Sequence, residues 1–248
     1  MLRQKREQIF GDASRNAYLC RMRIVEICAG DIQSAQAAVL GGAQRIELCS
    51  ALPLDGLTPS AGLIQAARSL EGIKLHVLIR PREGDFVYDA TETEIMLHDI
   101  SLAKQLGADG VVIGALTPDG DIDIPTCRRL IAAAEGMQVT FHRAFDRCAD
   151  PHRALEEIIA LGCSRLLTSG QAPTAEAGIP LLRELVHQAN GRIIIMPGAG
   201  VTPADARRIL DETGATEIHG SFRSLHNGRL ITDAQLVRKV FTALNRPH

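Results

Sequence analysis

Two near-copies of one short motif carry the residues best suited to chemistry. Glu26 and Cys28 end a first apolar run, and Glu47 and Cys49 end a second one. Neighbouring carboxylates can act as a general acid and a general base when their surroundings separate their pKa values. Cysteine thiolates are suitable ligands for a soft ion such as Cu(I). The two motifs therefore allow a proton-transfer site or a metal site.

Each of these interpretations has a simpler alternative. The two glutamates could instead form ion pairs, for which Arg80 and Arg143 are the expected partners. The two cysteines could be a buried pair of small apolar side chains. A zinc site is less favoured, because it needs four ligands and the sequence contains no Cys-x-x-Cys pair. The residues alone leave these alternatives open.

The segment between the motifs indicates how they come together. Residues 31–40 are predicted to form a helix, and Gly41 and Gly42 end it. A right-handed strand–helix–strand crossover makes the two strands parallel neighbours, about 4.8 Å apart. Because strand side chains alternate, Glu and Cys of each motif share one face. We expect all four at the carboxyl ends of the strands, where α/β proteins bind ligands.

The rest of the chain repeats this unit. Helices are predicted to end in a left-handed glycine at Gly42, Gly107, Gly162 and Gly214. Helix starts are predicted at an N-cap followed by proline, at Thr58-Pro59, Asp150-Pro151 and Thr202-Pro203, and at a capping box of Thr91 with Glu94. The predicted strands cover 24–28, 45–49, 74–80, 110–115, 138–142, 165–169, 192–196 and 217–221.

Eight strands that alternate with helices predict an α/β fold, a single-domain (β/α)8 TIM barrel over residues 22–248, since such barrels typically have about 250 residues. A doubly wound sheet is the alternative, but the first turn, Ala29-Gly30-Asp31, lacks the G-x-G-x-x-G pattern. Residues 1–21 are basic and poor in apolar side chains, and we expect a mobile leader or a non-native start there.

Composition argues against some classes of function and indicates where the protein is located. The 248 residues carry a net charge of −2, which does not favour nucleic-acid binding, and no apolar run approaches the ~18 residues of a membrane span. Six cysteines in a chain of this length, without a secretory signal, indicate reduced thiols and a cytoplasmic protein.

Further polar residues follow the predicted strands and suggest a site for a small anionic molecule. His142 beside Arg143 is a candidate catalytic or anion-binding pair. The other candidates of this kind are Arg80, Arg82, Asp85, Asp146 and Ser169. The turns after the last two strands supply Gly198, Ala199, Gly200, His219, Gly220 and Ser221. Many barrels bind phosphate at these two turns through backbone N–H groups, although tight turns also require glycine for their own geometry.

Six motifs together resemble the CutC copper homeostasis family over about residues 23–223. They are Arg45-Ile-Glu-Leu-Cys-Ser50, Gly56-Leu-Thr-Pro-Ser60, Ile79-Arg-Pro-Arg82 with Gly84-Asp-Phe86, Val139-Thr-Phe-His-Arg-Ala-Phe-Asp146, Leu167-Thr-Ser-Gly-Gln171 and Glu217-Ile-His-Gly-Ser221. The resemblance implies a cytoplasmic TIM barrel that forms a homodimer or a larger homo-oligomer. It also implies a role in copper handling, with Cu(I) held by Cys28 and Cys49.

The chain departs from the family pattern near the mouth of the site. Glu83 stands where glycine is usual, Phe222 stands where alanine is usual, and the segment 223–232 is shorter than in many relatives.

Three hypotheses follow. The first is a Cu(I)-binding protein. The second is a metal-independent lyase or isomerase for a small phosphorylated or anionic metabolite, with Glu26, Glu47 and His142 as acid–base groups. The third is a non-catalytic barrel that acts through partner proteins.

Overall fold

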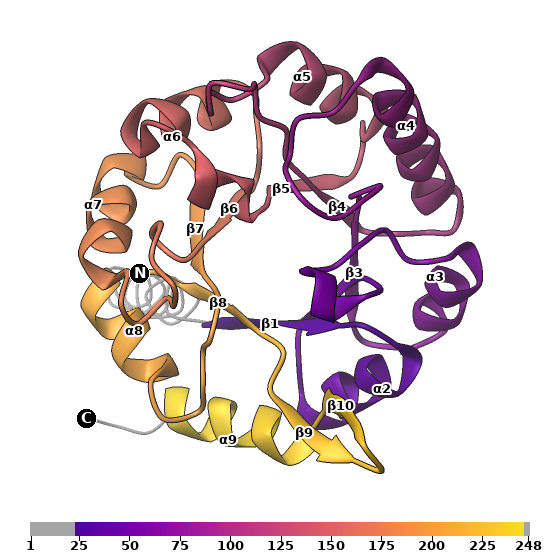
Figure 1. Ribbon diagram of the computed structural model, residues 1–248. Coiled ribbons are helices and arrows are strands. Elements are labelled where there is room, and N and C mark those ends of the chain that lie inside the picture. The colour runs from indigo at the N-terminus through magenta and orange to yellow at the C-terminus, as the bar shows by residue number, and fades with distance from the viewer. Residues whose placement is uncertain (1–22, 246–248) are drawn as a thin grey trace, which may run out of the picture.

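Eight parallel strands form a nearly closed barrel with helices around it in the computed structural model, which describes residues 23–245 (Figure 1). The strands are β1 (Ile24–Ala29), β2 (Arg45–Leu48), β3 (Lys74–Leu78), β4 (Gly110–Ile113), β5 (Gln138–Phe141), β6 (Arg165–Thr168), β7 (Ile194–Pro197) and β8 (Glu217–Gly220). Each strand from β1 to β6 pairs with the next one in the chain, and β8 pairs with β1. The predicted (β/α)8 barrel is confirmed, whereas the predicted leader, residues 1–21, lies outside the described residues.

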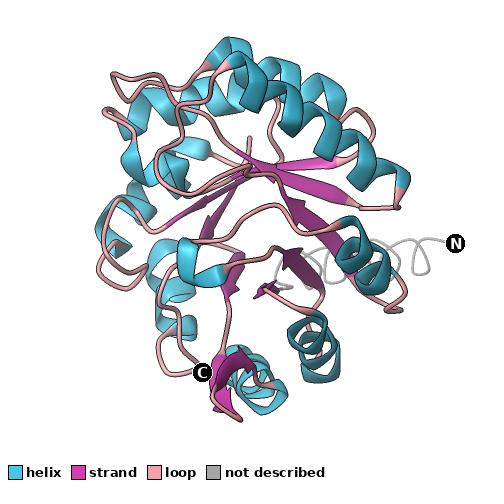
Figure 2. Ribbon diagram, turned by 45° about the vertical axis from the view of Figure 1, so that its right-hand side comes forward, coloured by secondary structure: helices cyan, strands magenta, loops and turns pink. Residues whose placement is uncertain are grey.

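The helices of the described chain lie outside the barrel (Figure 2). They are α2 (Ile32–Gly41), α3 (Ala61–Arg68), α4 (Ala90–Gln105), α5 (Ile124–Ala133), α6 (Pro151–Ala160), α7 (Ile179–Ala189), α8 (Ala206–Thr213) and α9 (Ala234–Leu244), with short 3₁₀ helices at Leu52–Leu54 and Arg143–Arg147. No helix in the described ranges is long and apolar enough to span a membrane.

The main hydrophobic core lies between the strands and the helices. In β1, Val25, Ile27 and Ala29 belong to this core, while Glu26 and Cys28 occupy the alternate positions, which face the barrel interior. The interior of a TIM barrel is usually filled by bulky branched side chains. Here the buried residues of the strands include five charged ones, Glu26, Arg45, Glu47, Arg165 and Glu217. The barrel strands therefore carry ionisable groups in the protein interior.

Helix ends were predicted better than helix starts. All four proposed C-terminal glycines have positive φ, between 79° and 93°. Asp150 caps α6 as predicted. The predictions at Thr58 and Thr91 are wrong, because the cap of α3 is Ser60 and the capping box before α4 is Asp89 with Glu92. Thr202 accepts from the Ala204 N–H at 3.3 Å, and its own N–H donates to Asp205, so it caps the turn that leads into α8.

A β-hairpin follows the barrel's last strand. Strands β9 (Arg223–His226) and β10 (Arg229–Thr232) are antiparallel, and Asn227 and Gly228 between them both have positive φ, as a tight hairpin turn requires. The hairpin lies beside α9 in Figure 1. The short segment 223–232 is therefore an ordered element next to the mouth of the barrel.

Candidate metal and small-molecule site

A cavity of about 450 Å³ opens at the carboxyl ends of the strands. Most of the residues proposed from the sequence line it, namely Cys28, Glu47, Cys49, Arg80, His142, Arg143, Asp146, Ala199, Gly200, His219, Gly220 and Ser221. The other proposed residues, Glu26, Arg82, Asp85, Ser169 and Gly198, do not line it. The structure thus gathers residues from distant parts of the chain into one site.

The two motif cysteines meet on one side of this cavity. Their Sγ atoms are 3.7 Å apart, and the Cys49 thiol also donates to the Ala29 carbonyl at 3.6 Å. Leu78 and Val112 pack with the two thiols in a small apolar cluster. The hydrogen bond with Cys49 and burial raise the pKa of the Cys28 thiol well above its usual value. Cys28 is therefore a protonated thiol at neutral pH when no metal is bound.

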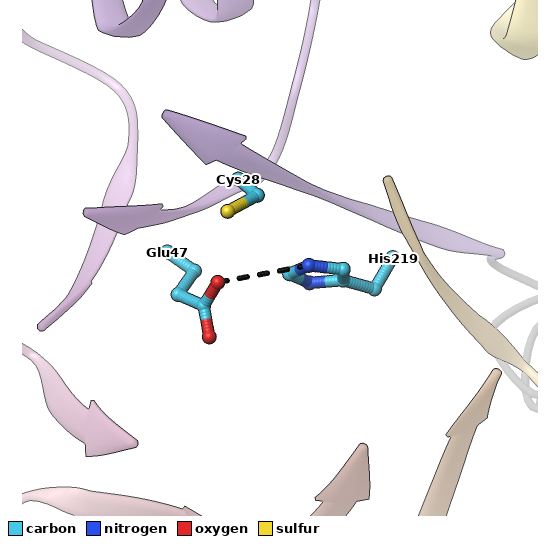
Figure 3. Close-up of side chains that lie close together, drawn as sticks. All are labelled: Cys28, Glu47 and His219. Atoms are coloured by element: carbon cyan, nitrogen blue, oxygen red, sulfur yellow. Dashed lines mark ion pairs between the residues drawn. The ribbon is translucent and has the colours of Figure 1, made fainter. Parts of the chain in front are cut away.

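His219 lies beside the cysteines and between the two glutamates. Its Nδ1 is 2.8 Å from Glu26 Oε1. Its Nε2 is 3.6 Å from Glu47 Oε2, and Figure 3 shows this ion pair beside Cys28. Cys28, Glu47 and His219 each offer a ligand atom, and these three atoms all lie within 4.8 Å of one another. The sequence had suggested His219 as an anion-binding residue, but the structure places it among groups that can bind a metal.

Burial and charge set the protonation of this group. Burial lowers the pKa of His219, but Glu47, Cys28 and Glu26 outweigh it and hold that pKa well above its usual value. Burial and the nearby Glu26 carboxylate raise the pKa of Glu47, although His219 partly offsets them. Burial likewise opposes ionisation of Glu26, but Arg45 and His219 hold its pKa far below the usual range. The pair Glu26–His219 is therefore an ion pair that leaves Nε2 directed toward Glu47.

Glu26 itself is completely buried within the barrel. Arg45 binds both Glu26 and Glu217, and Glu217 also accepts from Arg165 Nε at 2.8 Å. The alternative that paired the glutamates with Arg80 or Arg143 is wrong. Arg45 is the direct neighbour of Glu26 across β1 and β2, so the register supplies the partner. The sequence signal for Arg45 was its inward position two residues before Glu47.

The arginines proposed as ligand-binding groups have different roles. Arg80 donates to three loop carbonyls, those of Leu54 at 2.9 Å, Gly56 at 3.0 Å and Gly84 at 3.1 Å. It therefore holds the loops after β2 and β3 at the edge of the cavity. Arg82 forms ion pairs with Asp85 and Glu92 outside the cavity. Neither Arg82 nor Asp85 faces the site.

Asp146 and Ser169 form a support for Arg143. The Asp146 carboxylate accepts from the Ser169 N–H and hydroxyl, both at 3.0 Å, and from Arg143 Nε at 2.7 Å. The Asp146 carboxylate therefore holds the Arg143 side chain in position at the cavity wall. Sequence reasoning missed Phe86 and Arg147, which also line the cavity. Phe86 ends one of the motifs already noted and Arg147 directly follows another, but nothing in their spacing marked them.

The turns after β7 and β8 border the same cavity. Gly198 donates its N–H to the Thr168 carbonyl at 3.0 Å, so this amide is not free to bind an anion. Ala199 and Gly200 line the cavity, and both have positive φ. Of the residues predicted to bind an anion at these two turns, Ala199, Gly200, His219, Gly220 and Ser221 border the cavity and Gly198 does not.

The fold and the site define a (β/α)8-barrel protein with a polar cavity whose wall carries a cysteine pair, a histidine and a carboxylate. A family model described as the CutC family matches residues 23–224. The chain belongs to the CutC family.

Individual relatives agree with this assignment. A family protein CutC from Bacteroides thetaiotaomicron is 55% identical over 199 residues, which cover 80% of each chain. A family protein CutC from Glaesserella parasuis is 49% identical over 219 residues, covering 85% of this chain and 90% of the relative. A crystal structure named as a candidate copper homeostasis protein, CutC from Streptococcus agalactiae, superposes with a TM-score of 0.78 at 36% identity, over 81% of this chain and 99% of that one.

More distant barrels share the fold alone. Thiamine phosphate pyrophosphorylase from Pyrococcus furiosus superposes with a TM-score of 0.59 at 16% identity, over 90% of this chain and 96% of that one. Because this identity is low, we take nothing from it about the reaction or the ligand.

Proposed function

We propose that this protein binds Cu(I) through Cys28 and Cys49 and acts in copper homeostasis. The observation that carries the proposal is the 3.7 Å separation of the two Sγ atoms at the edge of the cavity. Metal–sulfur bonds of about 2.3 Å, the value known for zinc, would let one ion reach both atoms without moving the backbone. Two thiolates are soft ligands, which favour Cu(I) over harder ions. The copper homeostasis name of the Streptococcus agalactiae relative supports the same assignment.

His219 is the residue best placed to complete the coordination. A bent arrangement of two sulfur atoms leaves one side of the ion open, and His219 offers a ligand atom within 4.8 Å of that of Cys28. The bond of its Nδ1 to Glu26 fixes the ring and leaves Nε2 toward the cysteines and Glu47. A carboxylate that orients a ligating histidine is a common feature of protein metal sites.

Anaerobic titration of the reduced protein with Cu(I), in competition with a Cu(I) chelator, tests the proposal. We expect one ion per chain, and we expect the variant Cys28→Ser/Cys49→Ser to lose this site. The matched control is Cys127→Ser/Cys163→Ser, because these two thiols are buried among the helices and lie away from the cavity. Equal binding by the wild type and the first variant would refute the assignment.

A second candidate function is a metal-independent lyase or isomerase for a small anionic metabolite. The specific observation in its favour is the cavity volume of about 450 Å³, which falls within the 300–1,000 Å³ typical of small-molecule sites and exceeds the needs of one ion. Glu47 and His142 line the cavity and could transfer or stabilise a proton there. Glu26 would act through His219, because it does not reach the cavity itself.

A further inference from the structure

The His142 ring is held in one tautomer. Its Nδ1 accepts a hydrogen bond from the Ala144 N–H at 3.1 Å, so the ring hydrogen must lie on Nε2. Burial, and then the charge of Arg80, lower the pKa of His142 to about 3. His142 is therefore a neutral imidazole with a single N–H donor at physiological pH.

The position of the ring is fixed as firmly as its tautomer. A Cβ atom at Gly114 would lie 2.5 Å from His142 Nδ1, so glycine is needed beneath the ring. The Phe86 ring packs against it, with the two ring centroids 5.0 Å apart. His142 is only 5% exposed, yet it lines the cavity. The surroundings thus hold the donor in place against the wall of the cavity.

The Nε2 donor has no partner among residues 23–245. A buried donor without a partner is destabilising, so such groups are uncommon and call for an acceptor. An unpaired donor that is fixed in the wall of a cavity indicates a ligand that brings an oxygen acceptor.

Arg143 adds a fixed positive charge to this wall. Its Nε is bound to Asp146 at 2.7 Å, and its two terminal nitrogens donate to no other residue in the described ranges. A guanidinium held through Nε still presents donors that match a carboxylate or a phosphate. Arg147 and Arg223 border the same cavity. With Arg80 the cavity has four arginines against three carboxylates, those of Glu47, Asp55 and Asp146, so its charge favours an anion.

We propose that the wall formed by His142 and Arg143 binds the oxyanion group of a small organic molecule, a carboxylate or a phosphate. The neutral His142 Nε2–H donates to one anionic oxygen, and Arg143 balances the charge. The site uses neither cysteine, so it goes beyond the Cu(I) proposal and does not depend on it. If the second candidate function is correct, this wall is the part that recognises the substrate.

Nitrogen NMR of the full-length reduced protein, labelled with 15N-histidine, tests the proposal directly. We expect His142 to appear as the neutral Nε2–H tautomer, and we expect its Nε2 signal to shift when malonate or inorganic phosphate is added. The exposed residue His152 provides the internal control, because it lies outside the cavity. A shift with malonate alone identifies a carboxylate ligand, and a shift with phosphate alone identifies a phosphate ligand. No shift with either probe would overturn the proposal.

A pair of variants separates recognition from structure. In His142→Asn the side-chain oxygen can still accept from the Ala144 N–H, as asparagine does at helix starts, but the Nε2 donor is lost. We expect its affinity for the effective probe to fall roughly 10- to 100-fold. His142→Gln can restore a donor near Nε2 and should keep most of the affinity. Equal binding by wild type and His142→Asn would contradict the assignment.

The two proposals can fail separately. Cys28→Ser/Cys49→Ser should bind the probe anion as the wild type does, whereas His142→Asn should keep its Cu(I) site. Loss of anion binding in the cysteine variant would mean that the anion sits at the sulfur atoms and not on the His142 wall.

Discussion

Replacing Arg45 with methionine should lower the free energy of unfolding by about 3–5 kcal/mol. Arg45 lies inside the barrel and binds both Glu26 and Glu217, and all three side chains are at least nine-tenths buried. Without the guanidinium, Glu26 keeps its contact with His219, but the interior retains more negative than positive charge. Urea unfolding followed by circular dichroism measures the loss, which is a large fraction of the 5–15 kcal/mol typical of a domain.

Two further variants make this result interpretable. Arg129→Met removes an arginine from an ion pair with Glu94 on the surface, where both side chains are about half exposed, and it should cost no more than about 1 kcal/mol. Arg45→Met/Glu26→Gln removes one buried charge of each sign and should lose less stability than the two single changes added together. A loss in Arg45→Met as small as that in Arg129→Met would show that the interior charges do not hold the barrel together.

The affinity for Cu(I) should rise at least 100-fold for each pH unit between about pH 6 and pH 8. A cysteine thiol has an ordinary pKa of about 8.5, and the surroundings of Cys28 raise its pKa further. A thiol must lose its proton to bind the ion, and each proton released on binding contributes a factor of ten per pH unit. His219 is protonated before binding, because Glu47, Cys28 and Glu26 raise its pKa against the effect of burial. If it binds the ion, it releases a third proton.

Competition titrations at several pH values measure this slope, with the chelator calibrated at each pH. The variant Cys28→Ser keeps one motif thiol, so it should bind Cu(I) more weakly than the wild type. It also releases one proton fewer, so for each pH unit its affinity should rise by a factor about ten times smaller. A wild-type affinity that does not change with pH would contradict binding by two thiols.

The barrel could be predicted from the sequence because its signals are local and repeated. Four helices are followed by a left-handed glycine, and each strand is a short apolar run, so the repeated unit is visible without any knowledge of its contacts. Ligand sites of such barrels lie at the carboxyl ends of the strands, and this general rule was enough to predict that Cys28, Glu47 and His142 lie close together. Starts of helices were less predictable, since several polar residues near Thr58 and Thr91 could each have provided the cap.

Partners inside the barrel could not be predicted in the same way. The pairing of Glu26 with Arg45 depends on the register between β1 and β2, and a single-residue change in register would have exchanged the inward and outward faces. The contact of His219 with Glu26 depends on closure of the barrel between β8 and β1, which joins residues 193 positions apart. Arg80 appeared to be a ligand-binding residue, because its three carbonyl partners lie in loops whose path the sequence does not specify.

X-ray absorption at the copper edge can show whether Cys28 and Cys49 hold the proposed Cu(I) ion. The spectrum of the Cu(I)-loaded wild-type protein should show two sulfur neighbours, and Cys127→Ser/Cys163→Ser should give the same spectrum. Cys28→Ser/Cys49→Ser should show no sulfur at the copper. A wild-type spectrum without sulfur neighbours, or one that both variants reproduce, would contradict the claim.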